Sequence, residues 1–246
     1  MMLKDLRQSR IDLTITNQPG VLRGLSYAIG RDHRKIVVVD NTLYLGGLNL
    51  SQSVFERADF MAKINDRDIV EVFKYVFNQS EQTSRKDDWE IYCGYDNTRV
   101  LVDSGNGGSL ILETAINEIN NARKSIDLMT IGHISGGMDL AINNAIERGV
   151  KVRGFLSPRG SLGRALFPSP KRMVIYQPRQ GISHAKLLII DEQIAILGSH
   201  NFDQRLVWAR TEEASLLTSR THIVKPLVDF FEKTIAGGVR VQRKDT

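Results

Sequence analysis

Two kinds of apolar pattern alternate along this chain of 246 residues. Short runs rich in β-branched residues predict buried strands, whereas apolar residues that recur every three or four positions predict helices with one buried face. The pattern predicts helices over 69–77, 110–122, 138–148 and 223–235, and strands over 36–39, 43–45, 126–131, 150–156, 187–190 and 194–197. This alternation of strands and helices is typical of an α/β protein.

One sequence pattern occurs twice. The first copy runs from His33 through Lys35 to Asp40 and continues as Gly46-Gly47-Leu48-Asn49, and the second runs from His184 through Lys186 to Asp191 and continues as Gly198-Ser199-His200-Asn201. In each copy the apolar run after the lysine is followed by polar turn residues and a second apolar run. Each copy therefore predicts a strand hairpin in the core of a sheet.

The repeat divides the chain into two expected units. The polar stretch 78–88 predicts a linker, so the units are residues 1–82 and 83–246. We expect two similar halves, each with a mixed β-sheet flanked by helices. A helix over 3–10 and a strand over 11–16 are predicted before His33, which leaves the first half short of a strand–helix–strand unit at its N-terminus. The sequence does not distinguish a natural short form from a truncated one.

The repeated pattern suits chemistry on a phosphate ester. Residues two apart share a face of a strand, so each histidine points the same way as the lysine that follows it. Lysine ammonium groups neutralise phosphate oxygens, while one imidazole attacks phosphorus and the other protonates the leaving oxygen. Asn49, Asn201 and Ser199 are expected to donate hydrogen bonds to the same oxygens. Such a site needs no metal and no cofactor.

These motifs resemble those of the phospholipase D superfamily, which includes cardiolipin synthases and metal-independent nucleases. The second motif matches the family pattern without a gap, and its continuation through Asp203 and Arg205 to Glu212 is similar to the cardiolipin synthase type. The first motif departs from the pattern by one residue fewer between Asp40 and its glycine pair. Leu206 stands where the family usually has serine.

The resemblance implies a role for each motif residue. His33 is expected to be the nucleophile that forms a phosphohistidine, and His184 the general acid and later the base. Glu212 is expected to orient one histidine and Asp59 the other; strand alternation puts Glu213 on the opposite face from Glu212, so only one of them can serve. Structural roles are expected for the remaining motif residues, namely Asp40, Asp191, Gly47 and Gly198. His200 occupies a variable position and receives no catalytic role.

Charge and cysteine content narrow the setting. The net charge of +5 and the pI of about 9.3 favour an anionic partner. Residues 151–186 contain no Asp or Glu, and we expect them to form a basic wall that binds substrate through Arg159, Arg164, Lys171 and Arg172. The single cysteine, Cys93, favours a reducing compartment. Without a signal peptide or membrane span in the sequence, we expect a cytoplasmic protein whose membrane contact, where there is one, is peripheral.

The sequence thus favours a phospholipase D-type phosphodiesterase or phosphatidyltransferase that acts on a phospholipid. Two alternatives stay open. One is a nuclease or other metal-independent phosphodiesterase of the same superfamily, with nucleic acid as its partner, and the other is a non-catalytic phosphate-binding remnant. The sequence also leaves open whether the chain forms a homo-oligomer.

Overall fold

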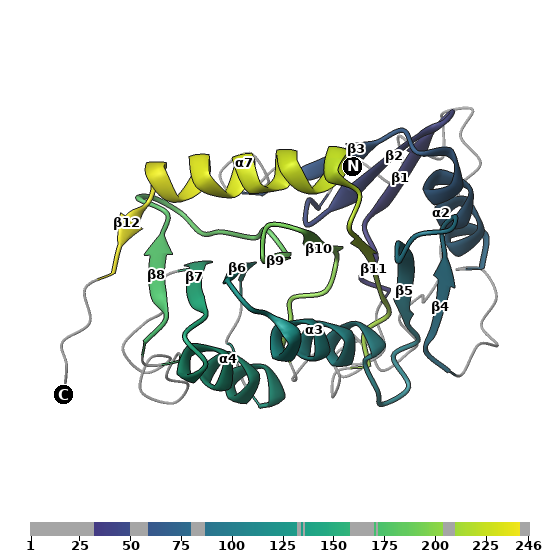
Figure 1. Ribbon diagram of the computed structural model, residues 1–246. Helices are drawn as coiled ribbons and strands as arrows, with labels where there is room; N and C mark the ends of the chain where they lie inside the picture. The colour runs from purple at the N-terminus through teal and green to yellow at the C-terminus, as the bar shows by residue number, and fades with distance from the viewer. Residues whose placement is uncertain are drawn as a thin grey trace, which may run out of the picture.

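A computed structural model describes residues 32–49, 59–79, 87–131, 134, 136–157, 170, 172–203 and 210–241. Within these residues the chain forms two β-sheets and four helices, with one sheet much larger than the other (Figure 1).

The larger sheet is mixed and has the order β12-β8-β7-β6-β9-β10-β11-β5-β4. Its β6–β7 and β7–β8 pairs are parallel and its other pairs are antiparallel. The strands are β4 (Trp89–Tyr92), β5 (Arg99–Asp103), β6 (Ser125–Thr130), β7 (Lys151–Leu156), β8 (Val174–Gln177), β9 (Leu187–Ile190), β10 (Ile194–Gly198), β11 (Glu213–Thr218) and β12 (Val239–Arg240).

The smaller sheet carries the first motif. It consists of β1 (Ile36–Val39), β2 (Thr42–Gly46) and β3 (Met61–Ile64), all antiparallel, and is followed by helix α2 (Arg67–Gln79). The β1–β2 hairpin and the β9–β10 hairpin place their motif aspartates alike, because Asp40 (φ 52°) and Asp191 (φ 53°) both adopt the left-handed conformation that Asp tolerates better than most residues.

Helices cover both faces of the larger sheet. Helices α3 (Leu110–Asn121) and α4 (Gly137–Glu147) lie below the sheet in Figure 1, and α7 (Thr221–Gly237) lies above it. Alternation along β9 serves both layers: Leu187 and Ile189 belong to the core that includes α7 and α2, whereas Leu188 and Ile190 belong to the core of α3 and α4. All four residues of β9 are buried, which explains why its sequence is apolar throughout.

The two sheets are joined through the start of the first motif. Asp32 forms a parallel bridge with Glu212, and the backbone N–H of His33 donates to the carbonyl of Glu212 at 2.9 Å. The side chain of Arg34 bonds Glu212 at 2.6 Å and Asp32 at 2.8 Å. The first motif is therefore attached directly to the strand that follows the second motif.

The α/β class, the large mixed sheet and the predicted helices are confirmed, although each helix boundary differs by up to two residues. Among the described residues, the β1–β3 sheet is antiparallel and not the mixed sheet expected for the first half. The likeness of the two halves and their boundary near residue 82 stay predictions. The helix over 3–10 and the strand over 11–16 lie outside the described residues. In the part of the chain that the structure describes, no helix is long and apolar enough to cross a membrane.

Asp191 ties the β9–β10 turn to the loop before β6. Its carboxylate accepts the backbone N–H groups of Arg123, Lys124 and Ser125 at 3.0, 2.7 and 2.9 Å. Burial alone would raise the pKa of Asp191, but these three donors lower it on balance. This geometry agrees with the structural role expected for the residue.

Asp191→Ala should lower the free energy of unfolding by about 1–2 kcal/mol, because three N–H groups lose their acceptor and two of them are exposed to water. Asp40→Ala is the matched control, since Asp40 has the same backbone conformation and accepts no such set of N–H groups within the described residues. Its cost should stay below about 1 kcal/mol. Urea denaturation at neutral pH measures both, and equal costs would contradict the role given to Asp191.

Candidate active site

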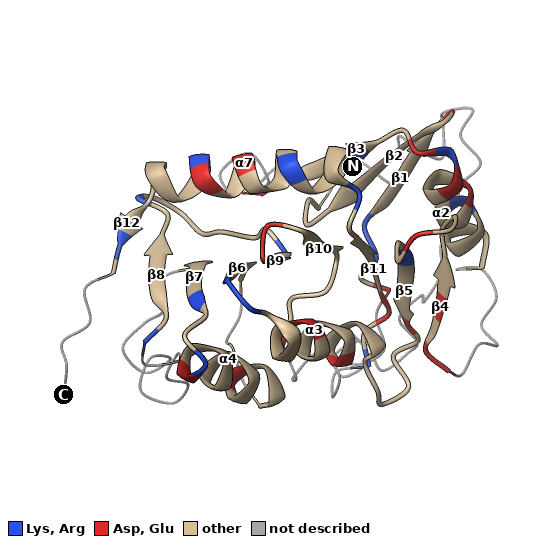
Figure 2. Cartoon of the chain, in the orientation of Figure 1, with Lys and Arg blue, Asp and Glu red and all other residues tan. Residues whose placement is uncertain are grey.

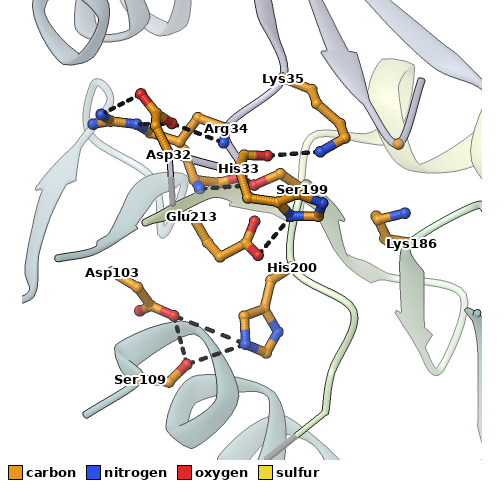
Figure 3. Close-up of polar contacts among 12 residues, drawn as sticks. Asp32, His33, Arg34, Lys35, Asp103, Ser109, Lys186, Ser199, His200 and Glu213 are labelled. Carbon is orange, nitrogen blue, oxygen red and sulfur yellow. Dashed lines mark hydrogen bonds and ion pairs between the residues drawn. The ribbon is translucent and has the colours of Figure 1, made fainter. Parts of the chain in front are cut away.

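His33 is held by the carboxylate of Glu213. Its Nδ1 lies 2.7 Å from Glu213 Oε1, and the Glu213 side chain is fully buried (Figure 3). Burial works to raise the pKa of Glu213, but the hydrogen bond and the charge of His33 outweigh burial and bring the pKa to about 2. Because an ionised carboxylate only accepts hydrogen bonds, the proton of a neutral His33 ring resides on Nδ1. Nε2 then keeps its lone pair for reaction.

The prediction that Glu212 orients a histidine is therefore wrong, because Glu213 makes this contact instead. Glu212 turns to the opposite face and bonds Arg34. The sequence argument that only one of the two glutamates can serve is correct, but the sequence does not say which face of β11 meets the site. Arg34, between His33 and Lys35 in the motif, provides the missing signal, since its charge needs a carboxylate on the other face.

His184 is held by the segment that follows the first motif. Its Nδ1 lies 3.0 Å from Asp59 Oδ2 and 3.0 Å from the carbonyl oxygen of Gly47. The contact expected between Asp59 and a histidine is present. A Cβ at Gly47 would lie 2.5 Å from the carbonyl oxygen of His184 and 2.4 Å from Asp59 Oδ1, so only glycine allows this approach.

Two lysines surround the histidines with positive charge. Lys186 is fully buried, and its Nζ lies 2.6 Å from the carbonyl oxygen of His184 and 3.3 Å from the ring Nε2. Lys35 Nζ donates to the carbonyl of His33 at 2.7 Å. Burial lowers the pKa of His184, and the charges of Lys186 and Lys35 lower it further, while Asp59 acts in the opposite direction. In the free protein this environment favours a neutral His184.

Ser199 and Asn201, two of the neutral residues expected to donate to phosphate oxygens, differ in the hydrogen bonds they already make. Ser199 is fully buried, and its hydroxyl accepts the N–H of Ala214 at 3.0 Å and donates to the carbonyl of the same residue at 3.3 Å. Ser199 therefore fixes the turn, and its expected role as a phosphate donor stays a prediction. Asn201 is 9% exposed, and its Oδ1 has no hydrogen-bond partner among the described residues. Its backbone carbonyl accepts the hydroxyl of Thr130. Gly198 packs against the carbonyl of Ala214, where a Cβ would lie only 2.3 Å away.

A cavity of about 450 Å³ opens beside His33. The described residues that line it combine motif residues with an apolar wall: Asp32, His33, Arg34, Lys35, Ile36, Val37, Tyr44, Leu48, Asn49 and Met61. Asn49 thus lies where the sequence predicted it, next to the first histidine and lysine. The cavity offers a polar end at the motif and an apolar remainder.

The expected basic wall is only partly described. Arg159, Arg164 and Lys171 lie outside the described residues, and Arg172 is exposed near the start of β8. Arg153 of the same stretch pairs instead with Asp127 and Glu232. Figure 2 shows described Lys and Arg residues spread over the segment before β1 and over β7, α7 and β12. Among the described residues, no group of three or more His, Cys, Asp or Glu side chains could hold a metal ion.

Comparisons with known proteins agree with the motifs. Residues 115–235, which include the second motif and Glu213, match the family model "Cardiolipin synthase, PLD-like domain". The chain is similar to cardiolipin synthase A of Buchnera aphidicola, with 26% identity over 227 residues, 77% of this chain and 45% of that protein. The chain spans about half the length of the curated relatives it matches.

Two solved structures share the fold. Phosphatidylserine synthase of Haemophilus influenzae aligns with a TM-score of 0.69 at 14% identity, over 87% of this chain and 64% of its own. Nuc of Salmonella typhimurium, described as a phospholipase D family member, aligns with a TM-score of 0.51 at 21% identity, over 60% of this chain and its full length. Both alignments support the α/β fold with its large mixed sheet.

Binding of a tetrahedral dianion should load a proton onto His184. The anion would neutralise Lys35 and Lys186, whose charges lower the pKa of His184 in the free protein, so the pKa should rise and the ring should take up a proton. Sulfate is the probe because it does not titrate near neutral pH. Calorimetric titrations at pH 7 in buffers of different ionisation enthalpy should show uptake of up to about one proton per site, and binding should tighten from pH 8 to pH 6.

His184→Gln should abolish this uptake, whereas His222→Gln should preserve it, because His222 is an exposed histidine paired with Asp66 away from the motifs. Undiminished uptake in the His184 variant would assign the proton to another group.

Proposed function

Since this chain belongs to the phospholipase D superfamily, we propose that it transfers or hydrolyses a phosphatidyl group through a phosphohistidine on His33. The exchange of partners between the two motifs carries this proposal. Glu213, which follows the second motif, bonds the first histidine, and Asp59, which follows the first motif, bonds the second. Two histidines held in this way, with two lysines beside them, are equipped for displacement at one phosphorus atom.

In the first step, Nε2 of His33 attacks phosphorus and the bond from phosphorus to the leaving oxygen breaks. His184, protonated in the complex, gives its proton to that oxygen. The Nδ1–H of His33 stays bonded to Glu213, whose negative charge balances the charge that develops on the ring. Ionisation of Glu213 throughout the neutral range suits this role.

In the second step, water or an alcohol attacks the phosphohistidine while His184, now neutral, accepts its proton. The N–P bond breaks, and the electron pair returns to Nε2 of His33. Lys35 and Lys186 stabilise the charge on the non-bridging oxygens in both steps, together with the side chains of Asn49 and Asn201. Water as acceptor gives hydrolysis, and an alcohol gives transfer.

The cavity beside His33 favours a lipid over a nucleic acid. Alternation along β1 continues the face of His33 and Lys35 into Val37 and Val39, which are 37% and 53% exposed. An apolar surface directly after the nucleophile suits the diacylglycerol part of a phospholipid. A metal-independent nuclease with the same pair of motifs stays the second candidate. The third reading, a phosphate-binding remnant, accounts less well for two histidines that both keep their carboxylate partners.

The intermediate should be trapped in one variant and absent in the other. After exposure to bis(p-nitrophenyl) phosphate and an acid-free quench, His184→Ala should carry the adduct on His33, because the good leaving group needs no acid and no base activates water. His33→Ala should carry none. Mass spectrometry of the quenched protein locates the adduct, and EDTA should not change its yield.

An adduct on His184 in the His33 variant would exchange the two roles. Hydrolysis by the wild type without an adduct in any variant would mean direct attack by water and would defeat the two-step mechanism. A wild type that binds sulfate but cleaves no phosphodiester would favour the remnant.

Substitution of Val37 should separate lipid from soluble substrates. Val37→Asp should lower kcat/KM on phospholipid vesicles about ten-fold, because the side chain lines the cavity and loses its apolar contact. Turnover of bis(p-nitrophenyl) phosphate should not change. Val39→Asp is the matched control, since Val39 shares the strand and the face but does not line the cavity.

Equal rates of both variants on vesicles would contradict a role of the apolar cavity in binding the lipid. Cleavage of labelled single-stranded DNA or RNA, with vesicles left intact, would replace the lipid proposal by the nuclease.

A further inference from the structure

Glu213 lies in the middle of a row of three polar residues on neighbouring strands. On one side, the register of β11 and β5 pairs Glu213 with Asp103. On the other side, β10 and β11 pair Gly198 with Ser215, and the Ser199 N–H bonds the Ala214 carbonyl at 3.0 Å. Two residues beyond Gly198, this antiparallel register brings His200 opposite Glu213.

The two outer residues of this row meet each other. His200 Nε2 lies 3.9 Å from Asp103 Oδ2 and 3.5 Å from Ser109 Oγ, and the Ser109 hydroxyl lies 2.6 Å from Asp103 Oδ2 (Figure 3). Neighbouring strands are about 4.8 Å apart, so the backbones of His200 and Asp103 stand about 10 Å apart with β11 between them. Their side chains can approach only by leaning toward each other across the base of Glu213.

The direction of the hydrogen bonds fixes the proton of His200. The backbone N–H of Phe202 donates to His200 Nδ1 at 2.9 Å, so the proton of the neutral ring is on Nε2. That N–H faces Ser109 Oγ, and Ser109 in turn donates to Asp103. Burial lowers the pKa of His200, and the ring is only 1% exposed, so it stays neutral.

Asp103 is the acceptor at which this chain of bonds ends. Its Oδ1 accepts the N–H of Ile111 in the first turn of α3. Burial raises the pKa of Asp103 to about 7, and the hydrogen bonds from Ser109 and Ile111 act in the opposite direction. Ser109 is the N-cap of the same helix and accepts the N–H of Leu112 at 3.0 Å. The bridge from His200 to Asp103 is thus anchored on the N-terminal end of α3.

We propose that His200 is a positioning residue for His33, because the bridge from His200 through Ser109 to Asp103 confines the carboxylate of Glu213 to the direction of His33. This inference rests on the proposed function only for the value of such positioning in catalysis. Glu213 gains from the confinement, since one of its oxygens bonds His33, whereas the other, Oε2, has no hydrogen-bond partner among the described residues. A single hydrogen bond fixes one oxygen only, so the torsions of this long buried side chain depend on what packs beside it.

The tautomer of His33 reports this confinement without any substrate. While Glu213 faces it, the neutral His33 ring should carry its proton on Nδ1; once Glu213 turns away, a share of the rings should move the proton to Nε2, the atom that must attack. Long-range ¹H–¹⁵N correlation spectra distinguish the two tautomers. The spectra are taken on wild type, His200→Ala, Ser109→Ala and His200→Gln, with Glu213→Gln as the reference for a lost partner.

We expect the Nδ1–H tautomer in wild type and a mixture with the Nε2–H tautomer in His200→Ala and Ser109→Ala. The same two variants should lower kcat on bis(p-nitrophenyl) phosphate by about 10- to 100-fold with KM unchanged, the usual effect of a slight misplacement of a reacting group. His200→Gln, whose amide N–H can reach toward Ser109, should keep a larger share of the Nδ1–H tautomer and a higher kcat than His200→Ala. Thr98→Val is the control, because it removes a buried hydroxyl pair with Thr218 on the same two strands but away from His33.

The proposal would be overturned if His200→Ala and Ser109→Ala both kept the wild-type tautomer and the wild-type kcat. A loss of kcat no larger than that of Thr98→Val would overturn it as well. The Ser109 variant keeps the test valid where the His200 variant does not fold. A tautomer change in a protein whose wild type cleaves no phosphodiester would support the positioning role of His200 and count against the proposed function alone.

Discussion

Each motif histidine bonds a carboxylate that lies beyond the other motif in the sequence, and the site depends on this exchange. Glu213 reaches His33 only because Asp32 and Arg34 attach the first motif to the start of β11. Asp59 reaches His184 only because Gly47 leaves room for the backbone of the second motif. Neither motif can orient its own histidine in this way. The contacts that join the two sheets are therefore also the contacts that orient the two rings.

Hydrogen bonds within the site stabilise two buried charged side chains. Lys186 and Glu213 are both fully buried, which is costly for an isolated ion and tolerable for one that is hydrogen-bonded and paired. The two histidines nonetheless have unlike surroundings. His33 meets one ionised carboxylate, whereas His184 shares its carboxylate with two lysines that oppose its protonation. Two copies of one motif thus place their histidines in unlike electrostatic surroundings, which suits the different roles proposed for them.

Local periodicity predicted the helices, both hairpins and the direction of each His–Lys pair, because these depend on side-chain alternation alone. Local periodicity could not predict contacts that depend on how strands distant in the sequence align. Glu212 and Glu213 are adjacent, and only the register of β11 against β10 decides between them. His200 received no role because it fills the variable position of the second motif, and its partners Asp103 and Ser109 lie about ninety residues earlier, beyond the reach of local pattern. The strand β7 in the basic stretch 151–186 was predicted, whereas β8 was not, and Arg153 forms a structural ion pair with Asp127 where a substrate-binding wall was expected.

The two hairpins differ most in what covers them, and this difference bears on function. In the second, the face of His184 and Lys186 continues into Leu188 and Ile190, which are sealed by the core of α3 and α4. In the first, the same face continues into Val37 and Val39, which are exposed. The His184 side chain is accordingly 8% exposed and that of His33 19%. An acid–base group whose pKa depends on burial profits from enclosure, whereas a nucleophile must be reached by its substrate. The more open hairpin therefore suits the nucleophilic role proposed for His33, and the apolar surface beside it is where the remainder of the proposed lipid substrate would lie.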